Sequence, residues 1–372
     1  MTHPPAGPDR PGAATSDLHF FPDWRRYNPF QDLLFSDLAR VGAAAVPVPG
    51  LLRHLTRATR SADPGVLNVQ WTTPVLGPVR DDEVARGRVA RLEEALTSYR
   101  DAGGRVVWTV HNVLPHDARH LEAEVLLARA LADHADVVHV LTESTIAAAA
   151  PFYRLDPART VCIPHSSYLD VYPDTVSRPE ARRRLGLRDD DRVLLALGQI
   201  RPYKGLDRLL DLVERLHAAD PRLRLLVAGA LADQPGAAQL AERLASAPGT
   251  VSTTRRVRDD EVQVWMRAAD LAVLPYLRVL NSGAFLLAET FGLPVVAPRV
   301  GALAEREGER HVRLFGDDDV EVVLRDAVRD LVADPAGARS AHESAAAAAA
   351  ARPPAAMAAA FADLVAPLFT EP

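Results

Sequence analysis

Short apolar runs alternate with amphipathic helical patterns along most of the chain. A run of four to six Val, Leu, Ile and Ala residues between polar turns is typical of a strand that is buried on both faces. The pattern predicts strands at 18–21, 43–48, 66–71, 105–110, 137–141, 161–164, 193–197, 223–228, 251–257, 271–274, 295–297 and 312–315. Because helical segments separate these runs, including one expected over 29–40, we expect parallel sheets in an α/β fold.

The length of the chain points to more than one domain, since 372 residues exceed the usual size of a single hydrophobic core. The apolar runs fall into two groups separated by a polar stretch. We expect a disordered tail over 1–16, domains over 17–168 and 169–340, and an Ala-rich helical segment over 341–372.

The stretch from 269 to 298 places a Ser-Gly turn between a buried strand and a helix. Asn281 and Ser282 are good helix caps, and Gly283 would let a ligand approach the backbone closely. Free N–H groups and the positive end of the helix dipole suit a phosphate. Glu289, two turns later, could hold two ribose hydroxyls. The alternative is an ordinary helix with a Glu on its exposed side.

A second loop carries two cations just beyond a strand. The run 193–197 ends at Gly198, and Arg201 and Lys204 follow before an amphipathic helix begins after Gly205. Arg binds phosphate as a fork and Lys as a point charge. Loops at the carboxyl ends of strands are where open α/β sheets bind ligands. A solvated loop is the alternative, but the two loops together favour a phosphate site.

With these two motifs the chain resembles the retaining GT-B glycosyltransferases of family 4, which use nucleotide-activated sugars. Their loop G-x-x-x-x-x-K-G stands here as Gly198 to Gly205, with Lys204 as its lysine. Their E-x7-E motif reads N-x7-E, because Asn281 stands at the first position and Glu289 at the second. The first carboxylate of that family contacts the donor sugar. Asn can donate and accept hydrogen bonds there, but it carries no charge.

The resemblance implies two Rossmann-like doubly wound domains that face a cleft, with a C-terminal helix that returns to the first domain. It also implies transfer of a sugar from a UDP- or GDP-sugar to a hydroxyl, with retention at the anomeric carbon. Arg201 and Lys204 would stabilise the leaving diphosphate. A non-catalytic GT-B module that binds a nucleotide sugar or a partner chain, and a nucleotide-sugar epimerase of the same fold, are the competing interpretations.

Histidines follow the fourth predicted strand in the loop VHNVLPHD. His111, just past the carboxyl end of that strand, is well placed to contact a ligand. It resembles the His that the family places near the donor sugar, and it joins Arg201 and Lys204 as a catalytic candidate. A His bonded to a backbone carbonyl is the alternative. We expect acceptor contacts from the first loop and from this one, at Arg25, Arg26, Tyr27, Asn28 and His116.

The segment 51–60 is expected to form a short basic helix. Arg53, Arg57 and Arg60 are spaced by four and three residues, so they share one face. Such a face could bind an anionic acceptor or lipid headgroups, and it could also simply be solvated. The acceptor itself, whether a sugar, a lipid-linked sugar or a small molecule, is not specified by these residues.

Composition excludes several other classes. The net charge of −6 implies no nucleic-acid partner, and the single cysteine, Cys162, excludes a disulfide framework and fits a reducing compartment. We therefore expect a cytoplasmic protein, with peripheral contact at the inner membrane surface through the basic helix. No zinc or P-loop motif is present. The acidic triplets 189–191 and 317–319 lie in polar turns, so no metal and no cofactor beyond the nucleotide sugar are expected.

Overall fold

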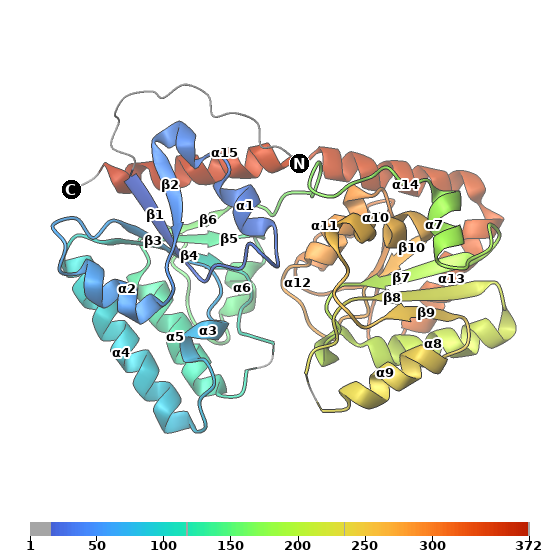
Figure 1. Ribbon diagram of the computed structural model, residues 1–372, viewed down its shortest axis with the longest axis horizontal. Helices are drawn as coiled ribbons and strands as arrows, with labels where there is room; N and C mark the ends of the chain where they lie inside the picture. The colour runs from blue at the N-terminus through green and yellow to red at the C-terminus, as the bar shows by residue number, and fades with distance from the viewer. Residues whose placement is uncertain (1–15, 117, 234, 371–372) are drawn as a thin grey trace.

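The computed structural model describes residues 16–370 except 117 and 234, and these residues form two parallel sheets of six strands (Figure 1). The strands of the first sheet are β1 (Ser16–Phe21), β2 (Ala43–Pro47), β3 (Val66–Val69), β4 (Arg105–Val110), β5 (Val137–Val140) and β6 (Thr160–Cys162). Those of the second are β7 (Arg192–Leu197), β8 (Leu223–Ala228), β9 (Thr250–Thr253), β10 (Leu271–Val273), β11 (Val295–Pro298) and β12 (Val312–Phe315). The predicted α/β class is confirmed. Residues 1–15 of the expected tail lie outside the described residues.

The strand order of each sheet reverses at one point, and each reversal leaves a crevice where a ligand can bind. The first sheet runs β2-β1-β3-β4-β5-β6 and the second β12-β11-β10-β7-β8-β9, with parallel pairing throughout the described strands. The order reverses between β1 and β3 in the first sheet and between β7 and β10 in the second. At such a reversal the following helices pass to opposite faces and leave a crevice at the carboxyl ends of the strands.

Helices cover both faces of the first sheet. They are α1 (Phe30–Phe35), η1 (Leu38–Val41), α2 (Leu51–Ala58), α3 (Thr73–Leu76), α4 (Asp82–Asp101), α5 (Leu121–His134) and α6 (Thr145–Ala149). The single helix predicted over 29–40 is wrong, because α1 ends at Phe35 and a 3₁₀ turn, η1, follows. The Ser36 hydroxyl donates to the Leu33 carbonyl at 2.9 Å, a local bond that competes with a continuing helix.

The second sheet is covered in the same way. Its helices are η2 (Pro202–Lys204), α7 (Arg178–Arg184), α8 (Leu206–Ala219), α9 (Ala237–Ser246), α10 (Asp259–Ala268), α11 (Gly283–Thr290), α12 (Gly301–Ala304) and α13 (Val320–Ala333). Helices α8, α9 and α13 lie on one face of the sheet, and α7, α10 and α11 lie on the other (Figure 1). The helix that follows β7 and the helix that follows β10 are therefore on opposite faces.

The Ala-rich end forms two helices that belong to different domains. Helix α14 (Pro335–Ala350) packs on α11 and α13, whereas α15 (Pro354–Val365) crosses back to pack on α1, and η3 (Ala366–Phe369) follows it (Figure 1). The expected return of a C-terminal helix to the first domain is confirmed. The expected boundary at residue 340 falls inside α14, so the change of domain comes later, at the break before Pro354.

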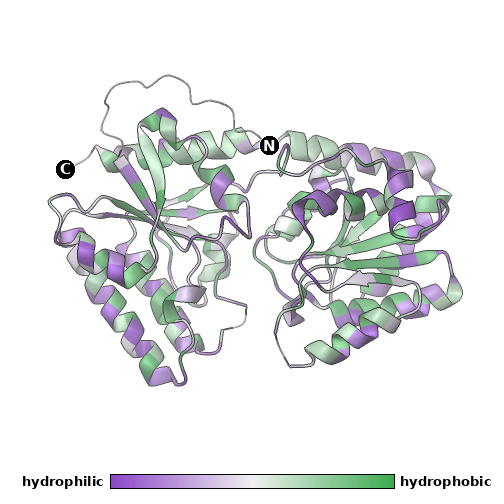
Figure 2. Ribbon diagram, in the orientation of Figure 1, coloured by the Kyte–Doolittle hydropathy of each residue, from purple (hydrophilic) through white to green (hydrophobic). Residues whose placement is uncertain are grey.

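Each sheet is buried between apolar helix faces, as the colouring of Figure 2 shows. In the first domain α15 completes the core, because Met357 and Phe361 pack with Phe20 and Phe30 against β1 and α1. The Phe361 side chain has no exposed surface and lies 5.7 Å from the Phe35 ring. Within the described residues, no helix has both the length and the apolar character that a membrane span requires.

The docking of α15 can be tested with Phe361→Ala. Removing a fully buried Phe leaves a cavity, so the free energy of unfolding should fall by about 3–5 kcal/mol in urea denaturation. Phe152→Ala is the matched control, because Phe152 is partly exposed on the first domain. Equal effects of the two substitutions would contradict the packing described for α15.

Candidate active site

The crevice at the strand-order reversal of the second sheet is formed by the loops after β7 and β10. The first loop approaches the second closely at Gly205, where the backbone has a φ of +65°. A Cβ at Gly205 would lie 2.1 Å from the Pro275 carbonyl oxygen, so a larger residue cannot be accommodated there. The backbone of Leu277 also donates to the Tyr203 carbonyl at 2.8 Å. These contacts hold the two predicted phosphate-binding loops together.

Lys204 lies in this crevice against Gly198 and Tyr276. Its Nζ is 5.6 Å from the centre of the Tyr276 ring, and a Cβ at Gly198 would lie 3.0 Å from it. Burial and the nearby charge of Arg201 lower the pKa of Lys204 to about 8. Arg201, on the same loop, donates from Nε to the Gln199 side chain at 3.0 Å. The structure thus brings together Gly198, Arg201 and Lys204 as predicted.

The start of α11 faces the same crevice. The Ser282 hydroxyl accepts from the Phe285 backbone N–H at 3.2 Å, which is the predicted N-cap. Asn281 donates from Nδ2 to the His111 carbonyl oxygen at 3.2 Å and so connects the two domains. Gly283 has a structural role that the sequence did not indicate, because a Cβ there would lie 2.8 Å from the Tyr168 hydroxyl oxygen.

His111 lies at the carboxyl end of β4, opposite these groups. Its ring stacks on Trp71 with the ring centres 3.9 Å apart, and its Nε2 is 2.7 Å from the Gln70 side-chain oxygen. Burial, together with the nearby His139 and His165, holds the pKa of His111 well below its usual value. The imidazole is therefore neutral at physiological pH.

Glu289 does not face the crevice, and its predicted contact with a ribose is corrected here. Its carboxylate has no exposed surface and accepts from Arg306 and His311 at 2.7 and 2.8 Å, and also from Arg352. Burial alone would raise the pKa of Glu289, but the His311 hydrogen bond and the charges of Arg352 and Arg306 lower it below its usual value. Its oxygens are already engaged, so it serves as a structural counter-ion.

Potential metal ligands gather around the same carboxylate. One ligand atom each from Glu289, Glu309 and His311 lies within 4.8 Å of the others, the one such group found among the described residues. Arg306 donates to both Glu289 and Glu309 at 2.7 Å, so the negative charge there is already balanced. This donor set, with guanidinium groups bound to its carboxylates, does not fit a cation site.

The first-loop residues that were predicted to contact the acceptor make different contacts in the structure. Arg25 pairs with Asp23 at 2.8 Å, and the Asn28 side chain accepts from the Phe30 backbone N–H at 3.0 Å, so both hold the loop itself. Arg26 is exposed, and the Tyr27 ring is 66% exposed. Arg256 of the second domain lies 5.5 Å from the Tyr27 ring, so Tyr27 contacts the opposite domain.

His116 also contacts the opposite domain. Its ring stacks on Tyr203 with the ring centres 4.0 Å apart, and its carbonyl oxygen accepts from Arg278. The loop between β4 and α5 therefore contacts both loops of the second crevice, through His111 and through His116. These contacts place His111 beside the loops that were predicted to bind phosphate.

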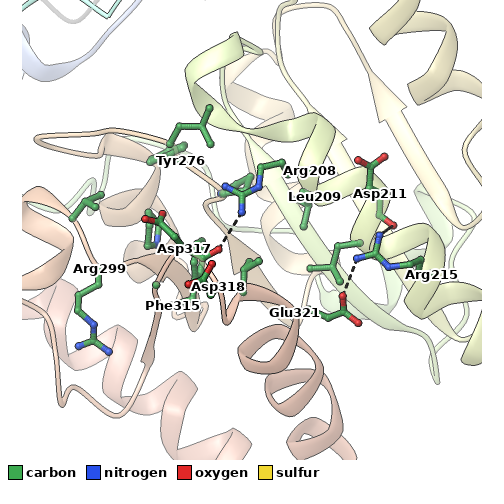
Figure 3. A pocket seen from close by; sticks show the side chains of 17 residues that line it. Arg208, Leu209, Asp211, Arg215, Tyr276, Arg299, Phe315, Asp317, Asp318 and Glu321 are labelled. Atoms are coloured by element: carbon green, nitrogen blue, oxygen red, sulfur yellow. Dashed lines mark hydrogen bonds and ion pairs between the residues drawn. The ribbon is translucent and has the colours of Figure 1, made fainter.

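A separate cavity of about 540 Å³ lies on the other side of Tyr276, between α8 and α13 (Figure 3). Two of its arginines are engaged, since Arg215 pairs with Glu321 at 2.8 Å and Arg208 donates to the Asp317 backbone carbonyl at 3.3 Å. In the acidic triplet beside it, Asp319 accepts from the Gly316 N–H at 2.6 Å, which is a turn role. Gly198 and Lys204 do not line this cavity, and Tyr276 separates it from the crevice.

Comparison with known proteins identifies the family. The profile of the family described as glycosyl transferases group 1 matches residues 191–334. A GDP-mannose:glycolipid 4-β-D-mannosyltransferase of Xanthomonas campestris pv. campestris is 30% identical over 277 residues, which are 73% of each chain. The chain belongs to this glycosyltransferase family. A D-inositol 3-phosphate glycosyltransferase of Geodermatophilus obscurus is 35% identical over 191 residues, which are 49% of this chain but only 42% of the length of that relative.

Solved structures of other proteins share the fold of this chain. Anabaena HepE in complex with UDP-glucose superposes with a TM-score of 0.69 at 15% identity, over 94% of this chain and 91% of HepE. WaaG, a glycosyltransferase involved in lipopolysaccharide biosynthesis, superposes with a TM-score of 0.65 at 18% identity, over 96% of both chains. The expected GT-B architecture of two Rossmann-like domains is confirmed.

Several residues of the candidate site were not predicted from the sequence. Gln70 and Trp71 hold His111, and Tyr276 lies under Lys204, yet none of them stands in a recognisable motif. Gln70 follows directly after β3, so its place at a strand's carboxyl end was the one available signal. Tyr276 lies in the loop that follows β10, three residues past its end.

The structural assignment of Glu289 predicts the effect of Glu289→Gln. The amide keeps the shape but leaves Arg352 without its carboxylate partner and Arg306 with Glu309 alone, so the free energy of unfolding should fall by about 3–5 kcal/mol. Glu94→Gln on the exposed side of α4 is the control and should change it by less than about 0.5 kcal/mol. Affinities for a nucleoside diphosphate and for pyrophosphate should change by the same factor. A selective loss of nucleoside diphosphate binding in a stable protein would restore the ribose assignment.

Proposed function

We propose that this chain transfers a sugar from a nucleoside-diphosphate sugar to an acceptor hydroxyl. The observation that carries the proposal is a series of contacts that links Lys204, the start of α11 and His111. Lys204 lies over the Tyr276 ring, whose hydroxyl oxygen is 3.4 Å from that of Ser282, and Asn281 donates to the His111 carbonyl oxygen. A cation and a helix N-terminus suit a diphosphate. A neutral imidazole on the facing domain suits the hydroxyl groups of a sugar.

In this reaction the bond between the anomeric carbon and the diphosphate oxygen breaks, and a bond to the acceptor oxygen forms. Negative charge grows on the departing diphosphate. Arg201 and Lys204 stabilise that charge where it develops, which is the interaction that accelerates transfer. The acceptor proton leaves with the diphosphate or passes to solvent, and we propose that no metal takes part.

The relatives support a nucleotide-sugar donor. HepE was solved with UDP-glucose, and the Xanthomonas relative is named for GDP-mannose and a glycolipid. We propose a UDP- or GDP-sugar as the donor here. Retention at the anomeric carbon is the family expectation, whereas the name of the Xanthomonas relative specifies a β-linked product. The anomeric configuration of the product, read by NMR, decides this point.

A donor panel tests the activity. UDP- and GDP-sugars are incubated with glycolipid and sugar acceptors in the presence of a chelator, and release of nucleoside diphosphate is followed with and without acceptor. Lys204→Ala should remove about 2.7–4 kcal/mol of transition-state stabilisation and so lower turnover roughly 10²–10³-fold. Lys204→Arg tests whether the charge alone suffices. A turnover of Lys204→Ala within threefold of the wild type would exclude the diphosphate role.

The acceptor is proposed to be presented at a membrane surface. On α2, Leu51 and Leu55 are buried while Arg53, Arg57 and the following Arg60 are exposed, and the Leu52 side chain is 38% exposed beside them. An exposed basic face with a protruding Leu suits anionic lipid headgroups. This arrangement supports peripheral contact of the first domain with an anionic leaflet, in keeping with the expected cytoplasmic location, and a lipid-linked acceptor.

Vesicle binding tests the basic face. Replacing Arg53, Arg57 and Arg60 by Gln should weaken binding to anionic vesicles by about 3 kcal/mol at low salt, since each basic residue contributes about 1 kcal/mol near such a surface. Salt should weaken wild-type binding through screening. The control replaces Arg183, Arg184 and Arg188, exposed on the second domain, by Gln for the same change in net charge. Equal losses in the two triple variants would reject α2 as the contact.

A further inference from the structure

A chain of buried polar side chains runs from β5 through β4 and β3 to His111. It consists of His139, Thr109, Asn68 and Gln70, none of which is more than 1% exposed. Buried polar groups in such a network require partners, and the direction of each hydrogen bond depends on which atoms can donate. Two backbone carbonyl oxygens, which can only accept, decide the direction of every hydrogen bond in this network.

The first carbonyl lies at the far end. His139 Nε2 is 3.0 Å from the Ile163 carbonyl oxygen, so this nitrogen carries the proton. Burial lowers the pKa of His139 to about 4, so the ring is neutral and its Nδ1 is an acceptor. The Thr109 hydroxyl, 3.3 Å from Nδ1, therefore donates to His139.

The second carbonyl, that of Val107, fixes the orientation of the side-chain amides of Asn68 and Gln70. Asn68 Nδ2 donates to the Val107 carbonyl oxygen at 3.2 Å and to the Thr109 hydroxyl oxygen at 3.1 Å. The Asn68 side-chain oxygen then accepts from Gln70 Nε2. This leaves the Gln70 oxygen, 2.7 Å from His111 Nε2, as an acceptor, so His111 Nε2 must donate.

We propose that Gln70 is a positioning residue that holds His111 as the Nε2–H tautomer and leaves Nδ1 as the acceptor. Stacking on Trp71, with an angle of 12° between the rings, keeps the imidazole in the plane that this bond requires. Phe30 contacts the ring from the side, with the ring centres 4.8 Å apart, and limits its rotation further. The tautomer is thus set by residues of β4, β5 and the end of β3.

The consequence for the reaction rests on the proposed function. With Nε2–H engaged by Gln70, a neutral His111 can offer only the Nδ1 lone pair to a ligand. It can accept a hydrogen bond from a sugar hydroxyl, but it cannot protonate the departing diphosphate. Stabilisation of the leaving group then falls to Arg201 and Lys204.

The tautomer can be measured without any ligand. In protein labelled with ¹⁵N at histidine, the shifts of the two ring nitrogens of His111, assigned by comparison with His111→Ala, report which one is protonated. At pH 7 we expect a single Nε2–H form. Gln70→Met removes the acceptor at similar volume and should produce a mixture of both tautomers. Gln263→Met is the matched control, because Gln263 is also a buried, hydrogen-bonded Gln but lies in the second domain. It should leave the His111 signals unchanged.

Three outcomes of the NMR measurement overturn the proposal: an Nδ1–H form in the wild type, unchanged His111 signals in Gln70→Met, or an equal change in Gln263→Met. Activity supplies a separate readout. Gln70→Met should lower turnover by at least about tenfold with little change in affinity for the nucleoside diphosphate. A shifted tautomer with unaltered turnover would remove the positioning role. If no donor in the panel is used, the proposed function fails while the tautomer measurement still stands on its own.

Discussion

The buried carboxylate of Glu289 ties α11 to two segments that are distant from it in sequence. It lies on α11, whose other end carries Asn281 and Ser282 into the crevice, and it binds Arg306, His311 and Arg352. Arg352 stands between α14 and α15, where the chain returns to the first domain. Its carbonyl oxygen accepts from the backbone N–H of Ser167 at 2.8 Å, in the segment where the chain first crosses between the domains. One network of ion pairs and hydrogen bonds therefore connects α11 to both segments in which the chain crosses between the domains.

Much of the fold follows from the apolar pattern, because strands of a parallel sheet are buried on both faces and stand out as continuous runs. The pattern places all twelve described strands and the loops after β7 and β10. It fails at 29–40, where the Ser36 hydroxyl bonds back to the Leu33 carbonyl. It fails also at the Ala-rich end, where composition predicts helix but does not say which domain each helix packs on.

Site residues can be predicted from the sequence where a side chain of suitable chemistry follows a strand. They are missed where their position depends on contacts between segments that are distant in sequence. His111 stands directly beyond β4 and Lys204 in the loop that follows β7, and both are found from the sequence. Glu289 has the spacing of a ligand-binding carboxylate, but its cationic partners Arg306 and Arg352 are distant in sequence, so its burial could not be read from the helix alone. The chain of hydrogen bonds behind His111 joins three strands and has no local signature.

The proposed function depends most on the charge of Lys204 in the crevice. Lys204 has a pKa of about 8 because it is buried beside Arg201, so it loses its charge just above neutral pH. A bound diphosphate stabilises the ammonium form and raises that pKa, which links binding to proton uptake. Calorimetry of nucleoside diphosphate binding in two buffers with different ionisation enthalpies measures this uptake directly. We expect it to rise from near zero at pH 7 to about one proton at pH 9 in the wild type, and to vanish in Lys204→Met. Binding without pH-dependent proton uptake in the wild type, or with equal uptake in Lys204→Met, would contradict the assignment of Lys204 to the diphosphate.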